Sequence, residues 1–191
     1  AREGGAVVFI FGRRHRWCMI IKYEMSPGQN TSMQGKRVTI FGGSGFIGRA
    51  ISRELIQAGA LVTIGCTDVE AAKAMKTLGR PGQVTVVKAD VIDAAAVARA
   101  VVGTDYVINL VGLLAPSGRH SFEKVHATAP GTIAAAARDA GVAGLAQLSA
   151  IGADAASKSA YARTKAAGEA AVHAAFPTAV ILRPSVVFGP D

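Results

Sequence analysis

Three glycines placed three residues apart constrain this chain more than any other feature of its sequence. Gly42, Gly45 and Gly48 stand in the segment GGSGFIG, directly after the β-branched run RVTIF at Arg37 to Phe41. Apolar residues then recur at helical spacing, at Ile47, Ala50, Ile51, Leu55 and Ala58. The pattern predicts a strand, a glycine turn and an amphipathic helix.

A turn of this kind can hold a pyrophosphate. One glycine permits the tight turn, the second lets the backbone approach the phosphates, and the third allows the helix to pack closely on the strand. Backbone N–H groups and the positive end of the helix dipole then face the anion. We therefore predict that a dinucleotide binds at Gly42, Ser44, Gly45, Phe46, Ile47 and Gly48.

The rest of the chain alternates between short apolar runs and helical patterns. Further strands are predicted at Leu61 to Ile64, Val84 to Lys88, Tyr106 to Val111, Leu145 to Ser149 and Ala179 to Leu182. Helices are predicted at Val69 to Leu78, at Ala94 to Val102, around Thr128 to Ala140 and around Ala160 to Ala175. Repeated βα units predict an α/β fold, a Rossmann-type doubly wound parallel sheet with helices on both faces.

The composition agrees with one globular domain. Of the 191 residues, 50% are hydrophobic and 18% charged, which is enough apolar surface for one substantial core. The apolar run from Tyr106 to Ala115 is interrupted by Asn109 and falls short of the roughly 20 residues that span a bilayer, so no transmembrane segment is expected. Cys18 and Cys66 suggest neither a metal site nor a disulfide framework, which favours the reducing cytoplasm.

The net charge of +8 is spread along the chain. Residues 1–35 hold five basic and two acidic side chains, a surplus of three. The other five charges form no dense basic run with interleaved aromatics. A solvated basic surface and an anionic cofactor explain the surplus better than nucleic acid, which is not expected as a partner.

The first 35 residues differ from the rest, and we predict them to be a flexible or non-native extension before a dinucleotide-binding domain over residues 36–191. They contain a short apolar stretch, a basic cluster and a polar segment. The apolar stretch is too short, and a small-residue cleavage site too unclear, for a secretory signal. A targeting peptide and a translated stretch upstream of Met33 both remain open, and the sequence MQGKRV that starts at Met33 favours the second.

Four motifs together resemble one family. They are GGSGFIG at 42–48, NLVG at 109–112, YARTK at 161–165 and RPSVVFGP at 183–190. In this order and spacing, from about Lys36 onward, the chain resembles the extended short-chain dehydrogenase/reductase family, which includes the NAD-dependent epimerases and dehydratases. The segments LSAIGAD at 148–154 and SAYARTKAAGEAAV at 159–172 most resemble its atypical branch, which contains the nucleotide-binding accessory subunit of respiratory complex I and its bacterial relatives.

The resemblance implies a catalytic role for Tyr161 and Lys165. Their spacing of four residues places both on one helix face, where a lysine ammonium can depress the pKa of a phenol that acts as general acid/base. Such a pair is also common on a solvated helix surface. In active relatives a Ser or Thr just beyond the preceding strand orients the substrate; here Ser149 is the candidate, but Ala150, Ile151 and Gly152 follow it. Ser149 is therefore either the third catalytic residue or a strand-end serine.

The same resemblance suggests how the cofactor is held. Asp68 lies about 20 residues after the last glycine, which suits a contact with the adenosine ribose. Cys66 lies where NAD-preferring members have an Asp, and Thr67 near where NADP-preferring members often have an Arg, so NAD and NADP both stay open. The remaining implied residues are Asp90 and Val91 on the adenine side, unless they form an ordinary strand-end turn, Asn109 and Gly112 beside the cofactor, and Pro184 and Ser185 at the nicotinamide.

His126 lies where many relatives place an Asn, and no second ligand accompanies it at metal-binding spacing. We predict a packing or cofactor-side role for it. After RPSVVFGP, extended members continue with a final strand and a substrate-binding region, which is absent after Asp191; the fold is therefore predicted to be truncated before that region, as in a fragment.

The resemblance leaves two main functions. The first is a cofactor-stabilised structural or assembly protein of the complex I accessory-subunit type, cytoplasmic or peripheral at the inner membrane, with a respiratory-complex or membrane-peripheral protein as partner. The alternative is an active NAD(P)-dependent oxidoreductase, epimerase or dehydratase that uses Tyr161 and Lys165. A redox sensor that reports cofactor occupancy to a partner ranks third.

Overall fold

The computed structural model describes residues 8–9, 20–21 and 33–188, and its main feature is a sheet of six parallel strands in the order β5-β4-β3-β6-β7-β8. The strands are β3 (Arg37–Phe41), β4 (Leu61–Cys66), β5 (Val84–Lys88), β6 (Tyr106–Asn109), β7 (Gly144–Leu148) and β8 (Val180–Leu182). β1 (Val8–Phe9) and β2 (Ile20–Ile21) pair antiparallel outside this sheet. Nearly all of the predicted 1–35 extension lies outside the described residues.

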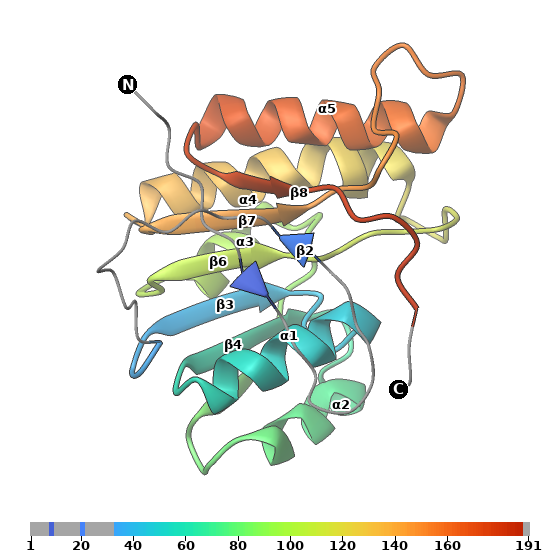
Figure 1. The fold of residues 1–191 in the computed structure, drawn as a ribbon. Coiled ribbons are helices and arrows are strands. Elements are labelled where there is room, and N and C mark those ends of the chain that lie inside the picture. Colours follow the sequence, from blue (N-terminus) through green and yellow to red (C-terminus); the bar gives the residue numbers. More distant parts are fainter. Residues whose placement is uncertain (1–7, 10–19, 22–32, 189–191) are drawn as a thin grey trace.

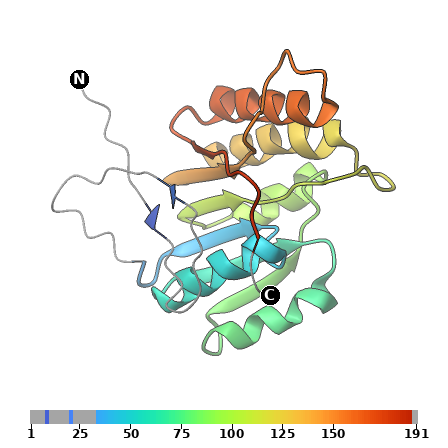
Figure 2. The same cartoon turned by 45° about the vertical axis from the view of Figure 1, so that its right-hand side comes forward.

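Helices cover both faces of the sheet (Figures 1 and 2). One face carries α1 (Phe46–Gln57), α2 (Val69–Ala72) and the 3₁₀ helix η1 (Lys73–Leu78), and the other carries α3 (Ala94–Val101), α4 (Ala129–Asp139) and α5 (Ala160–Ala175). Successive side chains of β3 point to opposite faces, so Ile40 enters the core under α1 while Phe41 enters the core under α3 and α4. The predicted doubly wound α/β fold is confirmed.

The helix predicted at Val69 to Leu78 changes type in the middle. It is α-helical to Ala72 and 3₁₀ from Lys73 onward. Ala72, Met75 and Leu78 are three residues apart, a spacing that brings side chains onto one side of a 3₁₀ helix. Ala72 and Met75 are buried there, so packing on the sheet favours the tighter winding.

The helix predicted around Thr128 to Ala140 is preceded by a π-helical segment, η2 (Glu123–Thr128), that the sequence pattern did not indicate. α5 packs directly on this segment through Gly168. A Cβ atom at Gly168 would lie 1.9 Å from the carbonyl oxygen of His126, so no other residue fits without moving one helix. The close approach brings the middle of α5 against the loop that follows β6.

Because all six strands are parallel, their carboxyl ends meet at one edge of the sheet, where open α/β sheets bind ligands. The glycine turn, the loops after β4, β5 and β6, and the ends of β7 and β8 share this edge. The segment after β8 turns along it toward α1 (Figures 1 and 2). Within the described part of the chain, no helix is both long and apolar enough to cross a membrane.

Candidate functional site

The glycine turn joins β3 to α1 with the geometry that the sequence predicts. Gly42 has φ +77°, which only glycine adopts without strain, and its N–H donates to the carbonyl of Gly65 at 3.1 Å. A Cβ atom at Gly48 would lie 2.1 Å from the carbonyl oxygen of Gly42. Gly48 therefore lets α1 begin against the turn itself.

Gly45 differs from these two glycines because its place in the turn is exposed. Its φ of −75° is open to any residue, and a Cβ atom there would meet the Gly42 carbonyl at 3.3 Å, a tight contact that a shift of a few tenths of an ångström relieves. Gly45 is the N-cap of α1 and supplies no side-chain cap. The helix N-terminus thus presents backbone to the carboxyl edge of the sheet, an arrangement that fits a phosphate group.

Two side chains that the sequence reasoning missed hold this turn in shape. The buried Ser52 hydroxyl donates to the carbonyl of Gly43 at 3.4 Å, and Arg49 Nε donates to the carbonyl of Ser44 at 2.9 Å. Both residues lie one or two helical turns beyond Gly45. A polar side chain at that distance from the glycine turn is the sequence feature that could have indicated them.

Just after β4, the Asp68 side chain bonds to a residue close to it in the sequence. Its carboxylate accepts from the Ala71 N–H at 3.0 Å and caps α2. The Cys66 thiol donates to the Asp68 carbonyl at 3.3 Å, and burial, followed by the charge of Asp68, raises the pKa of Cys66. Thr67 and Asp68 are both exposed at the sheet edge, so either can still meet a ribose.

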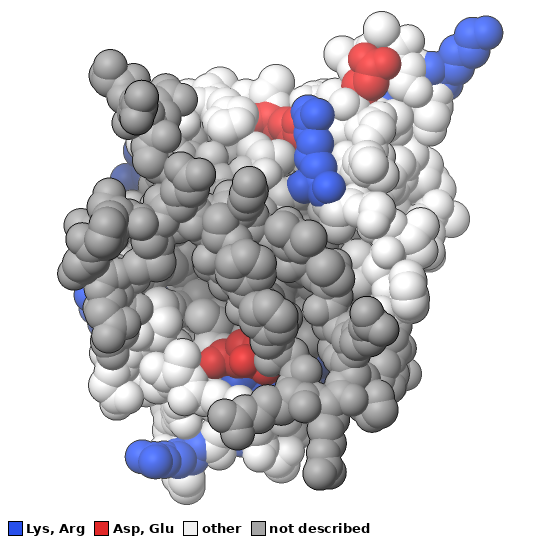
Figure 3. Space-filling view, viewed as in Figure 1, with Lys and Arg blue, Asp and Glu red and all other residues white. Residues whose placement is uncertain are grey.

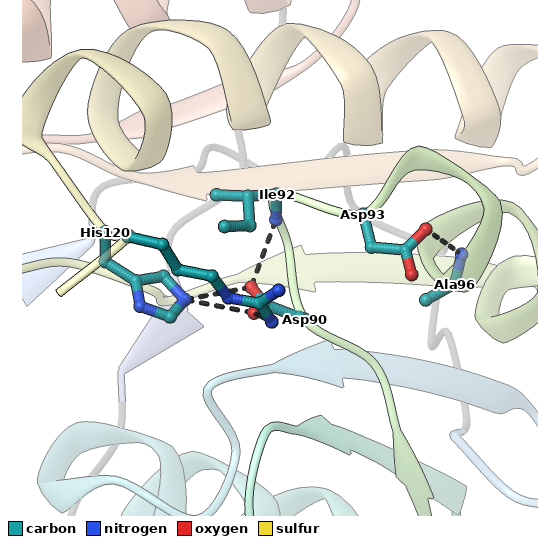
Figure 4. Close-up of polar contacts among 6 residues, drawn as sticks. Asp90, Ile92, Asp93, Ala96 and His120 are labelled. Carbon is teal, nitrogen blue, oxygen red and sulfur yellow. Dashed lines mark hydrogen bonds and ion pairs between the residues drawn. The ribbon is translucent and has the colours of Figure 1, made fainter.

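After β5, Asp90 is buried and heavily hydrogen-bonded, as Figure 4 shows. It accepts from the Ile92 N–H at 3.2 Å, from Arg119 at 2.5 Å and from His120 Nε2 at 3.0 and 3.1 Å. Burial alone would raise the pKa of Asp90, but these donors together hold it below its usual value. The Val91 side chain packs in the core beneath α3, so what it can offer a ligand is its backbone.

Asn109 and Gly112 shape the loop after β6. The Asn109 amide is fully buried; it donates to Gln147 at 2.8 Å, and its oxygen accepts from the Val111 N–H at 3.1 Å. Gly112 is exposed, and a Cβ atom there would come within 3.3 Å of Lys165 Nζ. The loop therefore passes directly over the lysine of the YARTK motif.

Tyr161 and Lys165 lie together on α5, as predicted, with Lys165 Nζ 5.8 Å from the centre of the tyrosine ring. The ammonium donates to the carbonyl of Leu148 at 3.4 Å rather than to the phenol. Burial lowers the pKa of Lys165 to about 8, against the opposing charge of Glu169, and burial raises the pKa of Tyr161. The predicted effect of the ammonium on the phenol pKa stays a prediction, since in this structure the amine bonds to backbone and burial is what raises the pKa of Tyr161.

His126 links the π-helical segment to the loop after β6 and to α5. It is 2% exposed, its Nε2 accepts from the Leu113 N–H at 2.8 Å, and its Nδ1 lies 3.5 Å from the Thr164 hydroxyl. Its ring meets the edge of Tyr161 at 5.1 Å between centroids. Burial and then the charge of Lys165 lower the pKa of His126 to about 4, so the ring is neutral at physiological pH.

Ser149 turns toward α5. Its hydroxyl is buried beside the Glu169 carboxylate and, within the described residues, reaches no partner in good hydrogen-bonding geometry. Glu169 instead accepts from Arg183 at 2.9 and 2.5 Å; burial opposes the lowered pKa of Glu169, and Arg183, Ser149 and His173 favour it. Sequence reasoning missed Glu169, although it lies four residues after Lys165 on the same helix face.

The end of β8 lies beside these groups. The Pro184 carbonyl accepts from the Ile151 N–H at 2.9 Å, while Ser185 is exposed. Ile151 is 70% exposed where the resemblance expects a substrate-orienting hydroxyl.

The sequence predicts scattered basic side chains and no metal site. Among the described residues no cluster of His, Cys, Asp and Glu could hold a metal ion. On the described part of the face in Figure 3, basic side chains lie apart from one another rather than in one broad patch.

One family model matches the chain, over residues 38–191: the NAD dependent epimerase/dehydratase family. The chain is 34% identical to NADH dehydrogenase [ubiquinone] 1 alpha subcomplex subunit 9, mitochondrial, of Mus musculus, over 93% of its own length and 48% of the relative. It is 33% identical to the NADH-ubiquinone oxidoreductase 40 kDa subunit, mitochondrial, of Neurospora crassa, over 86% and 44%. It is also 34% identical to the ceramide reductase of Caulobacter vibrioides, over 80% and 47%. The chain thus spans about half the length of these curated relatives.

Solved structures share the fold at lower identity. Pen from Bacillus thuringiensis superposes with a TM-score of 0.65 at 19% identity, covering 75% of this chain and 46% of that one. The triphenylmethane reductase of a Citrobacter species superposes with a TM-score of 0.63 at 18% identity, covering 78% and 49%.

Proposed function

The chain belongs to the NAD dependent epimerase/dehydratase family, and we propose that it binds NADP(H) or NAD(H) as a cofactor-stabilised structural or assembly protein of the complex I accessory-subunit type. A ligand that binds the folded state alone stabilises it by mass action, by roughly 2.7 kcal/mol at a hundredfold excess over the dissociation constant. In this proposal the bound nucleotide stabilises a surface that docks on a respiratory-complex protein, peripheral to the membrane.

The glycine turn supports the cofactor part of the proposal. Gly42 needs its positive φ, Gly48 has no room for a Cβ atom, and Gly45 supplies no side-chain cap to the N-terminus of α1. These features fit a pyrophosphate, which would lie against Ser44, Gly45, Phe46 and Ile47. The ribose and adenine would face Asp68 and Asp90, and the nicotinamide would face Tyr161, Lys165, Pro184 and Ser185.

The observation that carries the structural role is the direction of Ser149. Its hydroxyl is buried beside Glu169, and Ala150, Ile151 and Gly152 after it supply no other hydroxyl. A substrate at the sheet edge would therefore lack the group that orients it in active relatives. Two of the relatives reported above are NADH dehydrogenase or NADH-ubiquinone oxidoreductase subunits, which agrees with a role in such an assembly.

A pair of isosteric substitutions at Gly45 tests the cofactor site. Asp and Asn both suit an N-cap, and both place the same Cβ atom 3.3 Å from the Gly42 carbonyl, so any steric cost is shared by the two variants. Asp adds a negative charge where the phosphates would lie, and Asn does not. We expect titration with NADPH and NADH, followed by nicotinamide fluorescence, to show saturable binding by the unmodified protein, weaker binding by Gly45→Asn, and none by Gly45→Asp.

Equal affinity in the Asp and Asn variants would contradict an anion site at α1, and the absence of binding by the unmodified protein would refute the cofactor proposal. The ratio of NADPH to NADH affinity also decides which cofactor the region around Cys66, Thr67 and Asp68 prefers.

The second candidate is an active oxidoreductase, epimerase or dehydratase. It is favoured by the buried Lys165 beside Tyr161 and by the likeness to a ceramide reductase, which suggests a lipid-like alcohol or carbonyl as substrate. A bound nicotinamide would supply or accept the hydride, while Tyr161 would hold or release the substrate proton at its phenolic oxygen and Lys165 would supply positive charge.

Tyr161→Phe separates the two candidates. Turnover by the unmodified protein that is lost in this variant, with NADPH affinity unchanged, would establish the enzyme and refute the structural role. Cofactor that stays bound without turnover of alcohols, sugars or ketones, and that raises the thermal midpoint, is the outcome expected here.

A further inference from the structure

A short turn at residues 117–120 covers the adenine side of the proposed site. Ser117 and His120 exchange two backbone hydrogen bonds of 3.0 Å, and Gly118 at the tip has φ +55°. Residues 114 to 119 are all exposed, and Leu114 is 95% exposed. A segment with so little buried surface opens at low cost.

The 117–120 turn is joined to the nucleotide side by Asp90. His120 reaches the carboxylate from the loop in Figure 4, and the Arg119 guanidinium contacts the second oxygen at 2.5 Å. The Asp90 side chain is 9% exposed beneath these groups, whereas that of Arg119 is 68% exposed. The contact therefore shields Asp90 with a half-buried His120 and with an Arg119 that is itself largely in solvent.

Asp90 has little capacity left for a ligand while this contact lasts. A carboxylate accepts roughly four hydrogen bonds. Ile92, Arg119 and His120 already supply three donors, and the His120 N–H is shared between the two oxygens, so both oxygens are engaged. The exocyclic amino group of adenine is a donor that suits the same carboxylate, so it could pair with Asp90 after Arg119 or His120 had moved away.

We infer that the 117–120 turn is a strap over the adenine side of the nucleotide site, and that Arg119 and His120 compete with the adenine amino group for Asp90. This inference rests on the proposed dinucleotide binding. The strap is closed in the free protein and opens when the base binds, so part of the binding free energy is used to release it. The apparent affinity falls by the fraction of molecules that are open.

The test uses Arg119→Ala/His120→Ala, with Lys124→Ala as a control that removes one positive charge from a nearby exposed position away from Asp90. Because the strap no longer competes for Asp90, we expect the double variant to bind NADPH and ADP roughly fivefold more tightly. Nicotinamide mononucleotide, which lacks adenine, should bind with unchanged affinity. The control should bind all three like the unmodified protein.

Hydrogen exchange in the unmodified protein provides a second measurement. The amides of Ser117 and His120 should exchange faster when NADPH is saturating, because the strap has opened. Weaker or unchanged NADPH binding by the double variant, or slower exchange of these amides with NADPH, would overturn the strap while leaving the cofactor proposal intact. Failure of every form to bind NADPH, NADH or ADP would overturn both.

Discussion

The two halves of the site are formed by different kinds of chemical group. The nucleotide half, from β3 into α1, is made of backbone and small side chains: Gly42 takes a conformation that other residues avoid, and Gly48 excludes any side chain. The α5 half is made of buried polar groups, Lys165, His126 and Glu169, whose protonation states depend on one another. Changes in the first half should therefore act through steric fit, and changes in the second through pH.

The largest loss of stability is expected in the half formed by β3 and α1, where substitutions act through steric fit. Gly48→Ala places a methyl group 2.1 Å from the Gly42 carbonyl and must displace either the turn or α1, at a cost of about 3 kcal/mol. Gly45→Ala is the matched control, because its methyl group meets the same carbonyl at 3.3 Å without strain in φ. Urea unfolding at pH 7 measures both. Equal losses in the two variants would show that the contact of a Cβ atom at Gly48 with the turn does not determine the result.

An intermediate effect is expected at Lys165. Its folded pKa of about 8 lies below the unfolded value of 10.5, so the unfolded chain binds more protons between these values and stability rises with pH there. At pH 7 the buried charge is unfavourable. Lys165→Met should therefore stabilise the protein by roughly 2 kcal/mol at pH 7, and this gain should shrink toward pH 10. The Leu148 carbonyl keeps a donor in the variant, from Gln147 at 2.8 Å.

A lower stability of Lys165→Met at pH 7 would contradict this expectation, because the ammonium would then be a net stabilising group. Lys158→Met, an exposed change on the segment before α5, is the control and should show no such dependence on pH.

The smallest effect is expected at His126. Its pKa falls from 6.5 in the unfolded chain to about 4 in the fold, so its contribution to stability is complete above pH 6.5 and is lost as the pH falls toward 4. His126→Gln keeps an acceptor near the Leu113 N–H and does not titrate. Between pH 6.5 and 4, the free energy of unfolding of the variant should fall by roughly 1 kcal/mol less than that of the unmodified protein.

Chemical unfolding at several pH values measures this difference. His173→Gln on α5, which leaves His126 and its contacts in place, is the control. Parallel pH profiles for His126→Gln and the unmodified protein would mean that other groups carry the acid sensitivity.

Local features were predictable where neighbouring residues define the structure by themselves. The glycine turn, the strand RVTIF and the helix that begins at Ala160 and carries YARTK were placed correctly, because spacing, capping and period act within a few residues. The helix types were not predictable where packing overrides pattern, as at the 3₁₀ winding after Ala72 and the π-helical segment before Ala129. The ribose contact expected of Asp68 stays a prediction, and the structure adds that its carboxylate also caps α2.

The sequence alone determined the family, the doubly wound fold and the pairing of Tyr161 with Lys165, because these depend on motifs and periods within the chain. Only the tertiary structure decided what surrounds them. Ser149 faces Glu169 and Asp90 faces Arg119, although these partners lie 20 and 29 residues apart in the sequence. Contacts of that separation depend on how parallel strands bring their carboxyl ends together, and burial there sets each pKa.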